Sequence, residues 1–194
     1  MIFVSLGTQD KPFNRIIDYI LKLKEEIKEL EDIEIVFQIG QTKLSEDEKS
    51  KIDKINEKQV KLEVKDKNKD KDKNKKDIIV FNMIKPNVME EYITMSNIVI
   101  THAGVGTIME CINKNKEIIV LPRKEEYGEH VNNHQEEIAY EMEKKGLLKK
   151  VDTYEQLKNS VIEIIKNNEG KIKKNYISNN EKFNDMLINY LKNI

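Results

Sequence analysis

The stretch from Asn97 to Glu110 constrains the fold of this chain more than any other. Its first part, Ile98 to Ile100, is a continuous run of β-branched residues, which is typical of a parallel strand covered by helices on both faces. A turn with two glycines, Gly104 and Gly106, follows at once. Apolar residues then recur at helical spacing, so the chain passes from a buried strand through a glycine turn straight into a helix.

A glycine turn between a strand and a helix N-terminus is suited to binding an anion. Gly104 and Gly106 lack Cβ, so a phosphate can approach the backbone while unpaired N–H groups and the positive end of the helix dipole face it. We expect the Thr107 hydroxyl to cap the helix. Glycines in such a turn can also serve tight packing alone, and the motif by itself leaves that alternative open.

Glu110 has two interpretations that the spacing alone does not separate. Thr107 and Glu110 fit a capping box, in which a glutamate three residues after the cap returns to the N–H of the capping residue. Alternatively, the carboxylate points across the turn and accepts hydrogen bonds from the two vicinal hydroxyls of a ribose.

Four motifs in a fixed order carry a resemblance to a known family. They span residues 102–110, 118–123, 127–130 and 133–135, with the sequences HAGVGTIME, IIVLPR, YGEH and NHQ. Together they resemble the C-terminal, donor-binding half of GT-B glycosyltransferases of family 28. The chain is similar to the transferase that adds GlcNAc to lipid I and to the small subunit of the dolichol-linked GlcNAc transferase. It most resembles the capsular and exopolysaccharide glycosyltransferase subunits that work with a membrane-bound partner.

The resemblance implies a binding site for a UDP-sugar and assigns parts of it. The turn from Gly104 to Thr107 would hold the diphosphate, Glu110 the ribose, and the backbone of Asn82 and Met83 the uracil, while residues 133–135 would read the sugar hydroxyls. The full set of residues expected at the site is Gly7, Thr8, Asn82, Met83, His102, Ala103, Gly104, Val105, Gly106, Thr107, Glu110, Arg123, His130, Asn133, His134 and Gln135.

The three histidines are expected to differ in role. His102, at a strand end beside the glycine turn, could donate to a phosphate oxygen or tie its loop to a backbone carbonyl, and it is the candidate catalytic group in this chain. His130 is expected to order its loop, and the resemblance places His134 on the sugar. The histidines have no carboxylate or cysteine at metal-ligand spacing, so we expect no metal and no cofactor besides the UDP-sugar substrate. The helix N-terminus would then stabilise the leaving group.

Composition limits the remaining possibilities. With 194 residues, 38% of them hydrophobic, the chain has the size of one domain, spanning 1–194. It has no signal pattern and no apolar run near the roughly 20 residues that span a bilayer, which indicates a cytoplasmic protein. The 34 basic and 35 acidic residues nearly cancel, which argues against a nucleic-acid partner.

Cys111 is expected in the core. The two arginines differ: Arg15 is expected on a solvated helix face, and Arg123 near the site with its planar fork available.

Strand and helix patterns alternate along the chain, which predicts an α/β fold with a doubly wound parallel sheet, Rossmann-like. A dinucleotide-binding unit is disfavoured because the first turn has only Gly7 and the second strand ends in Gln38. Residues 65–77, rich in Lys and Asp, are expected to form a solvated loop. The expected strands are 1–6, 34–39, 60–64 at an exposed edge, 78–81, 97–101, 117–121 and 147–151, and the expected helices include 12–30, 45–58, 86–95, 133–145, 154–166 and 172–190.

These expectations describe a donor-binding subunit that transfers galactose or N-acetylglucosamine from a UDP-sugar to a lipid-linked acceptor in polysaccharide biosynthesis. The acceptor half is expected on a membrane-anchored partner that docks near residues 7–13 and 127–130 and supplies the catalytic base. This chain would then act at the inner membrane face. Two alternatives remain: a nucleotide-sugar-binding subunit without catalysis, and a fragment of a UDP-sugar 2-epimerase.

Overall fold

A computed structural model describes residues 1–65 and 77–168. Within these residues the strands form one parallel sheet in the order β3-β2-β1-β4-β5-β6, which confirms the doubly wound, Rossmann-like prediction. Strand order reverses between β1 and β4, and this reversal is the topological switch point of the sheet. The strands are β1 (Ile2–Ser5), β2 (Ile35–Gln38), β3 (Ile78–Phe81), β4 (Ile98–Thr101), β5 (Glu117–Val120) and β6 (Lys149–Lys150).

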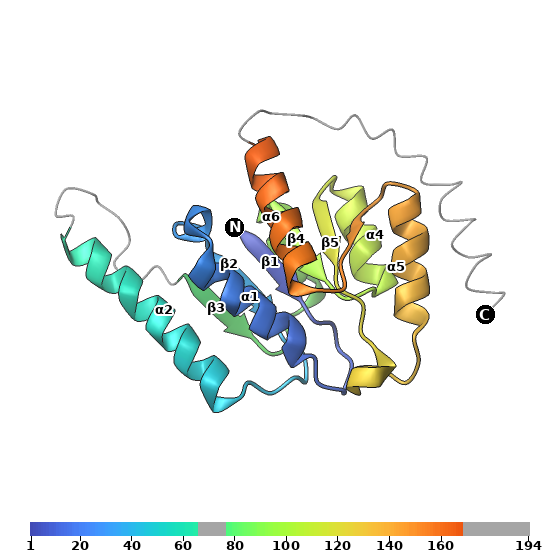
Figure 1. Cartoon of the computed structure of the whole chain (residues 1–194), viewed down its shortest axis with the longest axis horizontal. Coiled ribbons are helices and arrows are strands. Elements are labelled where there is room, and N and C mark those ends of the chain that lie inside the picture. Colours follow the sequence, from blue (N-terminus) through green and yellow to red (C-terminus); the bar gives the residue numbers. More distant parts are fainter. Residues whose placement is uncertain (66–76, 169–194) are drawn as a thin grey trace.

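Helices cover both faces of the sheet. Side chains of α1, α2 and α6 pack on one face, and those of α3, α4 and α5 pack on the other. Figure 1 shows α1 and α6 lying in front of the strands. The helices are α1 (Asn14–Glu26), α2 (Glu46–Lys65), α3 (Pro86–Met95), α4 (Val105–Asn113), α5 (His134–Lys144) and α6 (Tyr154–Asn168), with 3₁₀ turns η1 (Lys28–Leu30) and η2 (Glu125–Tyr127).

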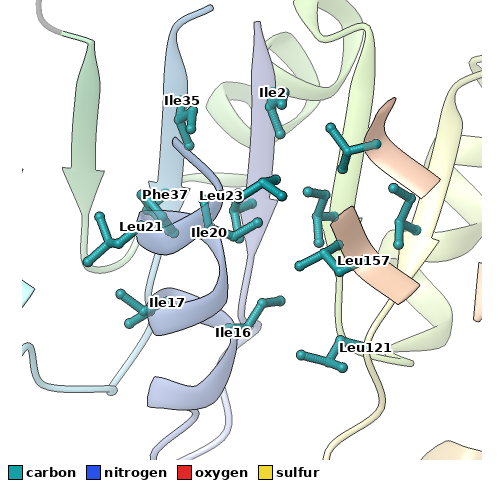
Figure 2. Close-up of a cluster of buried hydrophobic side chains, with 14 of the residues drawn as sticks. Ile2, Ile16, Ile17, Ile20, Leu21, Leu23, Ile35, Phe37, Leu121 and Leu157 are labelled. Atoms are coloured by element: carbon teal, nitrogen blue, oxygen red, sulfur yellow. The ribbon is translucent and has the colours of Figure 1, made fainter. Parts of the chain in front are cut away.

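The core beneath α1 shows why the strands are apolar throughout. Ile16, Ile20 and Leu23 of α1 recur at helical spacing and are fully buried. Figure 2 shows them above the sheet, close to Ile2 of β1 and Phe37 of β2. Alternate residues of β1 and β2 join the cluster on the opposite face, so every position of these two strands is buried. Each buried aliphatic side chain contributes about 1.5–3 kcal/mol, which stabilises the sheet that carries the site.

Two expected elements differ from the structure. Residues 60–64, expected as an edge strand, continue α2 to Lys65. The alternation of Val, Leu and Val there is interspersed with Lys and Glu, which are good helix formers, and a helix already running extends more easily than it stops. The first helix ends at Glu26 and is followed by η1 rather than continuing to Leu30. Residues 66–76 and the expected helix at 172–190 lie outside the described residues.

Asp77, expected to belong to a solvated loop, is instead buried. Its carboxylate lies 3.3 Å from the Nζ atom of Lys24, which is also buried. The ammonium group of Lys24 donates hydrogen bonds to the carbonyls of Leu30, Glu31 and Ile33. Burial lowers the pKa of Lys24, and Asp77 partly opposes that shift. The pair therefore joins the end of the α1 region to the start of β3.

Gly40, directly after β2, packs against the first turn of the chain. Its φ is +61°, in the left-handed region, and a Cβ built on it would overlap the carbonyl oxygen of Gly7. Gly146, after α5, has a similar φ of +70° but open space around its Cα. Both glycines therefore need a left-handed backbone, but only Gly40 lies against another residue.

Gly40→Ala should lower the free energy of unfolding by about 3 kcal/mol or more, because a left-handed backbone costs roughly 1–2 kcal/mol and the overlap adds to it. Gly146→Ala, the matched control, should cost only about 1–2 kcal/mol. Urea unfolding of both variants measures the difference. Equal losses would show that Gly40 does not hold the Gly7 turn closely.

Candidate functional site

The turns that carry the expected site residues meet at the carboxyl ends of the strands. Gly7 follows β1, Asn82 follows β3, and residues 102–107 follow β4. The segment 122–133 follows β5 and crosses the same edge of the sheet. Open α/β sheets bind ligands outside these strand ends, at the switch point, and here that point lies between β1 and β4.

Gln38, which sequence reasoning did not place at the site, links two of these turns. Its buried side-chain oxygen accepts hydrogen bonds from the Ser5 hydroxyl at 2.9 Å and the Gly7 N–H at 3.2 Å. Its amide nitrogen donates to the carbonyls of Gly7 and Asn82 at 3.0 and 3.3 Å. The sequence did contain a sign of this role, namely a polar amide at the end of an otherwise apolar strand. A buried polar group requires hydrogen-bond partners, so such a residue indicates contacts with neighbouring turns.

The N-terminus of α4 faces the switch point without a side-chain cap. Gly104 is the N-cap residue, and the first helical hydrogen bond runs from the Ile108 N–H to the Gly104 carbonyl. The N–H groups of residues 105–107 therefore precede the helical ladder. Gly106 is exposed, and a Cβ built on it would meet no atom within 4 Å. This is the open backbone that the glycine turn predicted.

The expectation that Thr107 caps this helix is wrong. The helix begins at Val105, so Thr107 lies inside the first turn and Glu110 lies in the second. The capping-box interpretation of Glu110 fails for the same reason. Its carboxyl group is half-buried, and desolvation together with the nearby Glu90 raises its pKa. The ribose contact expected of Glu110 stays a prediction.

His102 lies between the first turn and the start of α4. A Cβ on Gly7 would lie 2.5 Å from the His102 ring, and a Cβ on Gly104 would overlap the ring as well. Both glycines are thus required by the histidine, which joins β1 to β4. Burial lowers the pKa of His102 to about 4, and the positive charges of Arg123 and His130 act in the same direction. The imidazole is therefore neutral at neutral pH.

Arg123 does not present its fork to the rim as expected. Its side chain is completely buried, and its guanidinium donates to the carbonyls of Leu6, Lys11 and Glu129. The guanidinium also lies over the ring of Phe13, 4.6 Å from the ring centroid. These three hydrogen bonds make Arg123 an organiser of the turns, and its buried Nε atom has no hydrogen-bond partner among the described residues. Desolvation lowers its pKa to about 10, which leaves it charged at neutral pH.

Arg15 was expected on a solvated helix face, and this expectation is wrong. Its side chain is 13% exposed and holds both carboxylate oxygens of Glu129, at 2.9 and 2.7 Å. The same guanidinium donates to the Pro122 carbonyl and lies 5.0 Å from the ring centroid of Tyr127. Only the tertiary contact with the segment after β5 covers it. Arg15 therefore anchors that segment to α1.

The residues expected to read the sugar are partly committed to the protein itself. The side-chain oxygen of Gln135 accepts the N–H groups of Ala103 and Arg123 at 3.2 and 3.1 Å, which ties the turn after β4 to the turn after β5. The Asn133 oxygen accepts the Glu125 N–H. His134 contacts Glu137 through Nδ1 at 3.2 Å. The sugar contacts expected of these three residues stay a prediction.

The other expected residues are distributed over the rim as follows. His130 contacts Asn132 through Nδ1, which orders its loop as expected. Cys111 is buried in the core, where desolvation raises its pKa to about 12. The full set of expected site residues divides by exposure into three groups. They are exposed (Thr8, Asn82, Met83, Gly106, Asn133), half-buried (Gly7, His102, Gly104, Val105, Thr107, Glu110, His130, His134) or buried (Ala103, Arg123, Gln135).

Among the described residues, no cluster of three or more His, Cys, Asp or Glu side chains is arranged to hold a metal ion. The described helices also include none that is long and apolar enough to cross a membrane.

A model of the glycosyltransferase family 28 C-terminal domain matches residues 1–189 of the chain. The chain belongs to this family. A curated relative, UDP-N-acetylglucosamine transferase subunit ALG13 of Debaryomyces hansenii, is 36% identical over 74 residues, or 38% of this chain and 32% of that protein. The alignment thus spans about a third of the relative's length.

Two solved structures show how widely this fold is shared. The solution structure of ALG13 matches 96% of this family 28 chain and 94% of its own, with a TM-score of 0.54 and 21% identity. A UDP-N-acetylglucosamine 2-epimerase from Listeria monocytogenes matches 87% of this chain and 36% of its own, with a TM-score of 0.53 and 16% identity. At these identities the likeness establishes the fold alone.

The neutral His102 makes the stability of the fold depend on pH. The unfolded chain binds a proton at this residue below about pH 6.5, whereas the folded chain does so only near pH 4. Stability should therefore fall as the pH drops through this window, by up to about 3 kcal/mol.

Urea unfolding at several pH values, with His102→Gln as the comparison, measures this contribution. Carboxyl groups such as Glu110 affect both proteins alike, so the difference between the two curves isolates the histidine. Parallel curves would mean that His102 is not held in the neutral form.

Proposed function

We propose that this family 28 domain binds a UDP-activated hexose and transfers the sugar together with a partner subunit. The observation that carries the proposal is the open, uncapped N-terminus of α4 at the switch point of the sheet. The N–H groups of residues 105–107 and the positive end of the helix dipole favour an anion there. A nucleoside diphosphate supplies that anion together with a base and a ribose.

The turns around α4 suit the other parts of such a ligand. Glu110 lies one turn beyond the uncapped N–H groups, within the same helix, and accepts hydrogen bonds from the ribose hydroxyls. The exposed turn at Asn82 and Met83, fixed by Gln38 beneath it, receives the uracil through its backbone. Asn133 and His134, at the start of α5, contact the hexose, which is galactose or N-acetylglucosamine.

The chemistry required of this half is stabilisation of the leaving group. When the bond from the sugar to the diphosphate breaks, negative charge develops on the β-phosphate. Prearranged N–H groups at the α4 N-terminus stabilise that charge without any metal ion or additional cofactor. No side chain of the described site is placed to deprotonate an acceptor once His102 serves the phosphate, so the base comes from elsewhere.

The partner supplies the acceptor half. The ALG13 relative is named as a subunit of a transferase, which supports a two-component enzyme here. We propose that the second polypeptide is membrane-anchored and holds a lipid-linked saccharide at the cytoplasmic face of the membrane, in capsule or exopolysaccharide synthesis. It docks over the rim near residues 7–13 and 127–130, where Tyr127 is 58% exposed beside Arg15.

Substitutions at Gly106 test the phosphate site without disturbing the fold. A side chain here meets no neighbouring atom, and both Ala and Val are better helix formers than Gly. Gly106→Ala and Gly106→Val should therefore keep wild-type stability within about 0.5 kcal/mol. UDP affinity, measured by calorimetry, should fall slightly for Ala and at least tenfold for Val, because the larger side chain covers the N–H groups. If Gly106→Val bound UDP with wild-type affinity, the phosphate would not bind at the α4 N-terminus.

Transferase activity should require both subunits. The purified chain, supplied with UDP-galactose or UDP-GlcNAc and a membrane-extracted acceptor, should bind the nucleotide sugar but transfer no sugar. Adding the partner should restore transfer, and Gly106→Val should abolish it again in the complex. Partner-independent transfer at the full rate would show that the acceptor half lies in this chain. Binding with no transfer under any condition would favour a subunit without catalysis.

A further inference from the structure

The His102 ring lies among positive charges. Two side chains act on the ring as positive charges: Arg123, and His130 of the segment after β5. The α4 N-terminus adds a partial positive charge. The β1 and β4 residues that contact the ring, Ser5, Gly7 and Thr101, are uncharged. Glu129 and Asp10 act on Arg123, and no carboxylate among the described residues acts appreciably on the ring itself. The described side chains therefore place no negative charge beside the ring.

The hydrogen bonds around the ring determine which nitrogen carries the proton. Nδ1 lies 3.3 Å from the Thr101 hydroxyl oxygen, and the hydrogen of that hydroxyl is donated to the Ser5 carbonyl at 2.9 Å. The Thr101 oxygen can therefore only accept from Nδ1. In the neutral imidazole Nδ1 is thus protonated and Nε2 carries a lone pair.

That lone pair lies beside the N-cap residue of α4, next to the place where an anion would bind. Nε2 is the ring atom that a Cβ on Gly104 would meet first, and Gly104 is the N-cap of α4. Nε2 has no hydrogen-bond partner in the described part of the chain. A phosphate on the α4 N–H groups would meet an acceptor on His102, not a donor. The neutral ring and a bound phosphate therefore oppose each other.

We propose that His102 takes up one proton from solvent at Nε2 when the diphosphate of a nucleotide sugar binds, and then donates that proton in a hydrogen bond to a phosphate oxygen. This inference rests on the proposed function of the site. The proton returns to solvent when the diphosphate leaves, so no bond in the ligand changes. His102 thereby makes the site selective for a diphosphate over the uncharged nucleoside.

Proton uptake can be measured only if the pKa of His102 differs enough between the free and the ligand-bound protein. Burial holds the pKa of His102 at about 4 in the free protein. An opposite charge within hydrogen-bond distance raises a pKa by about 1–3 units, and a diphosphate brings two negative charges. Near pH 6 the free ring is therefore neutral, and the ring beside the ligand is largely protonated. Affinity should rise by up to tenfold per unit fall in pH within this range.

Calorimetry in buffers of different ionisation enthalpy counts the protons directly. UDP-GlcNAc and UDP-galactose are the probes, because both phosphates are esterified and do not titrate near neutral pH, unlike those of UDP. The expected uptake is about half to one proton per ligand near pH 6, falling towards zero near pH 8. Uridine should bind without any uptake. His102→Gln should bind the UDP-sugars more weakly and with no uptake.

The outcomes separate this inference from the function on which it rests. If neither UDP-sugar binds, the proposed function fails and the inference fails with it. If a UDP-sugar binds without proton uptake, or if the uptake persists in His102→Gln, only the inference is overturned. Nitrogen NMR of the wild-type imidazole rings gives a second measurement that does not depend on a variant. It should show an Nδ1–H tautomer in the free protein and a doubly protonated ring after UDP-sugar is added.

Discussion

The packing of His102 against Gly7 and Gly104 is the contact on which the rest of the rim depends. It joins the turn after β1 to the turn after β4, the two strands between which the sheet reverses its order. Both turns must lack a Cβ to accept the ring, so the turn that leaves the α4 N–H groups open also accommodates the histidine. The open N-terminus of α4 and the histidine beside it are therefore one structural unit.

Buried side chains hold the surrounding turns by satisfying their backbone groups. Gln38 links the turns after β1 and β3, Gln135 links those after β4 and β5, and Arg123 donates to three carbonyls in the segments after β1 and β5. An unsatisfied buried polar group costs about 1–3 kcal/mol, so each of these residues fixes a loop that would otherwise require water. A ligand then meets turns whose positions are already set, and less ordering is needed on binding.

The fold alone does not separate a transferase from an epimerase, since solved examples of both superpose on this chain. The family to which the chain belongs separates them. The described rim itself offers an uncapped helix N-terminus and a neutral histidine. The family model covers nearly the whole chain and places it with the glycosyltransferases, so the rim is best understood as the donor half of a transfer site.

The alternation of apolar strands and amphipathic helices determined the parallel sheet, because both patterns reflect burial that each element needs wherever it is placed. The glycine turn before α4 likewise specified an open helix N-terminus. Tertiary structure decided how the polar residues are used. Arg15 is largely covered and Arg123 is buried because segments distant in sequence fold over them. Gln38 holds two turns because β2 ends beneath them. The start of α4 depends on Gly104 packing against His102, so Thr107 and Glu110 are not capping residues. Local pattern carries no information about such contacts, since they exist only once strands far apart in the chain lie side by side.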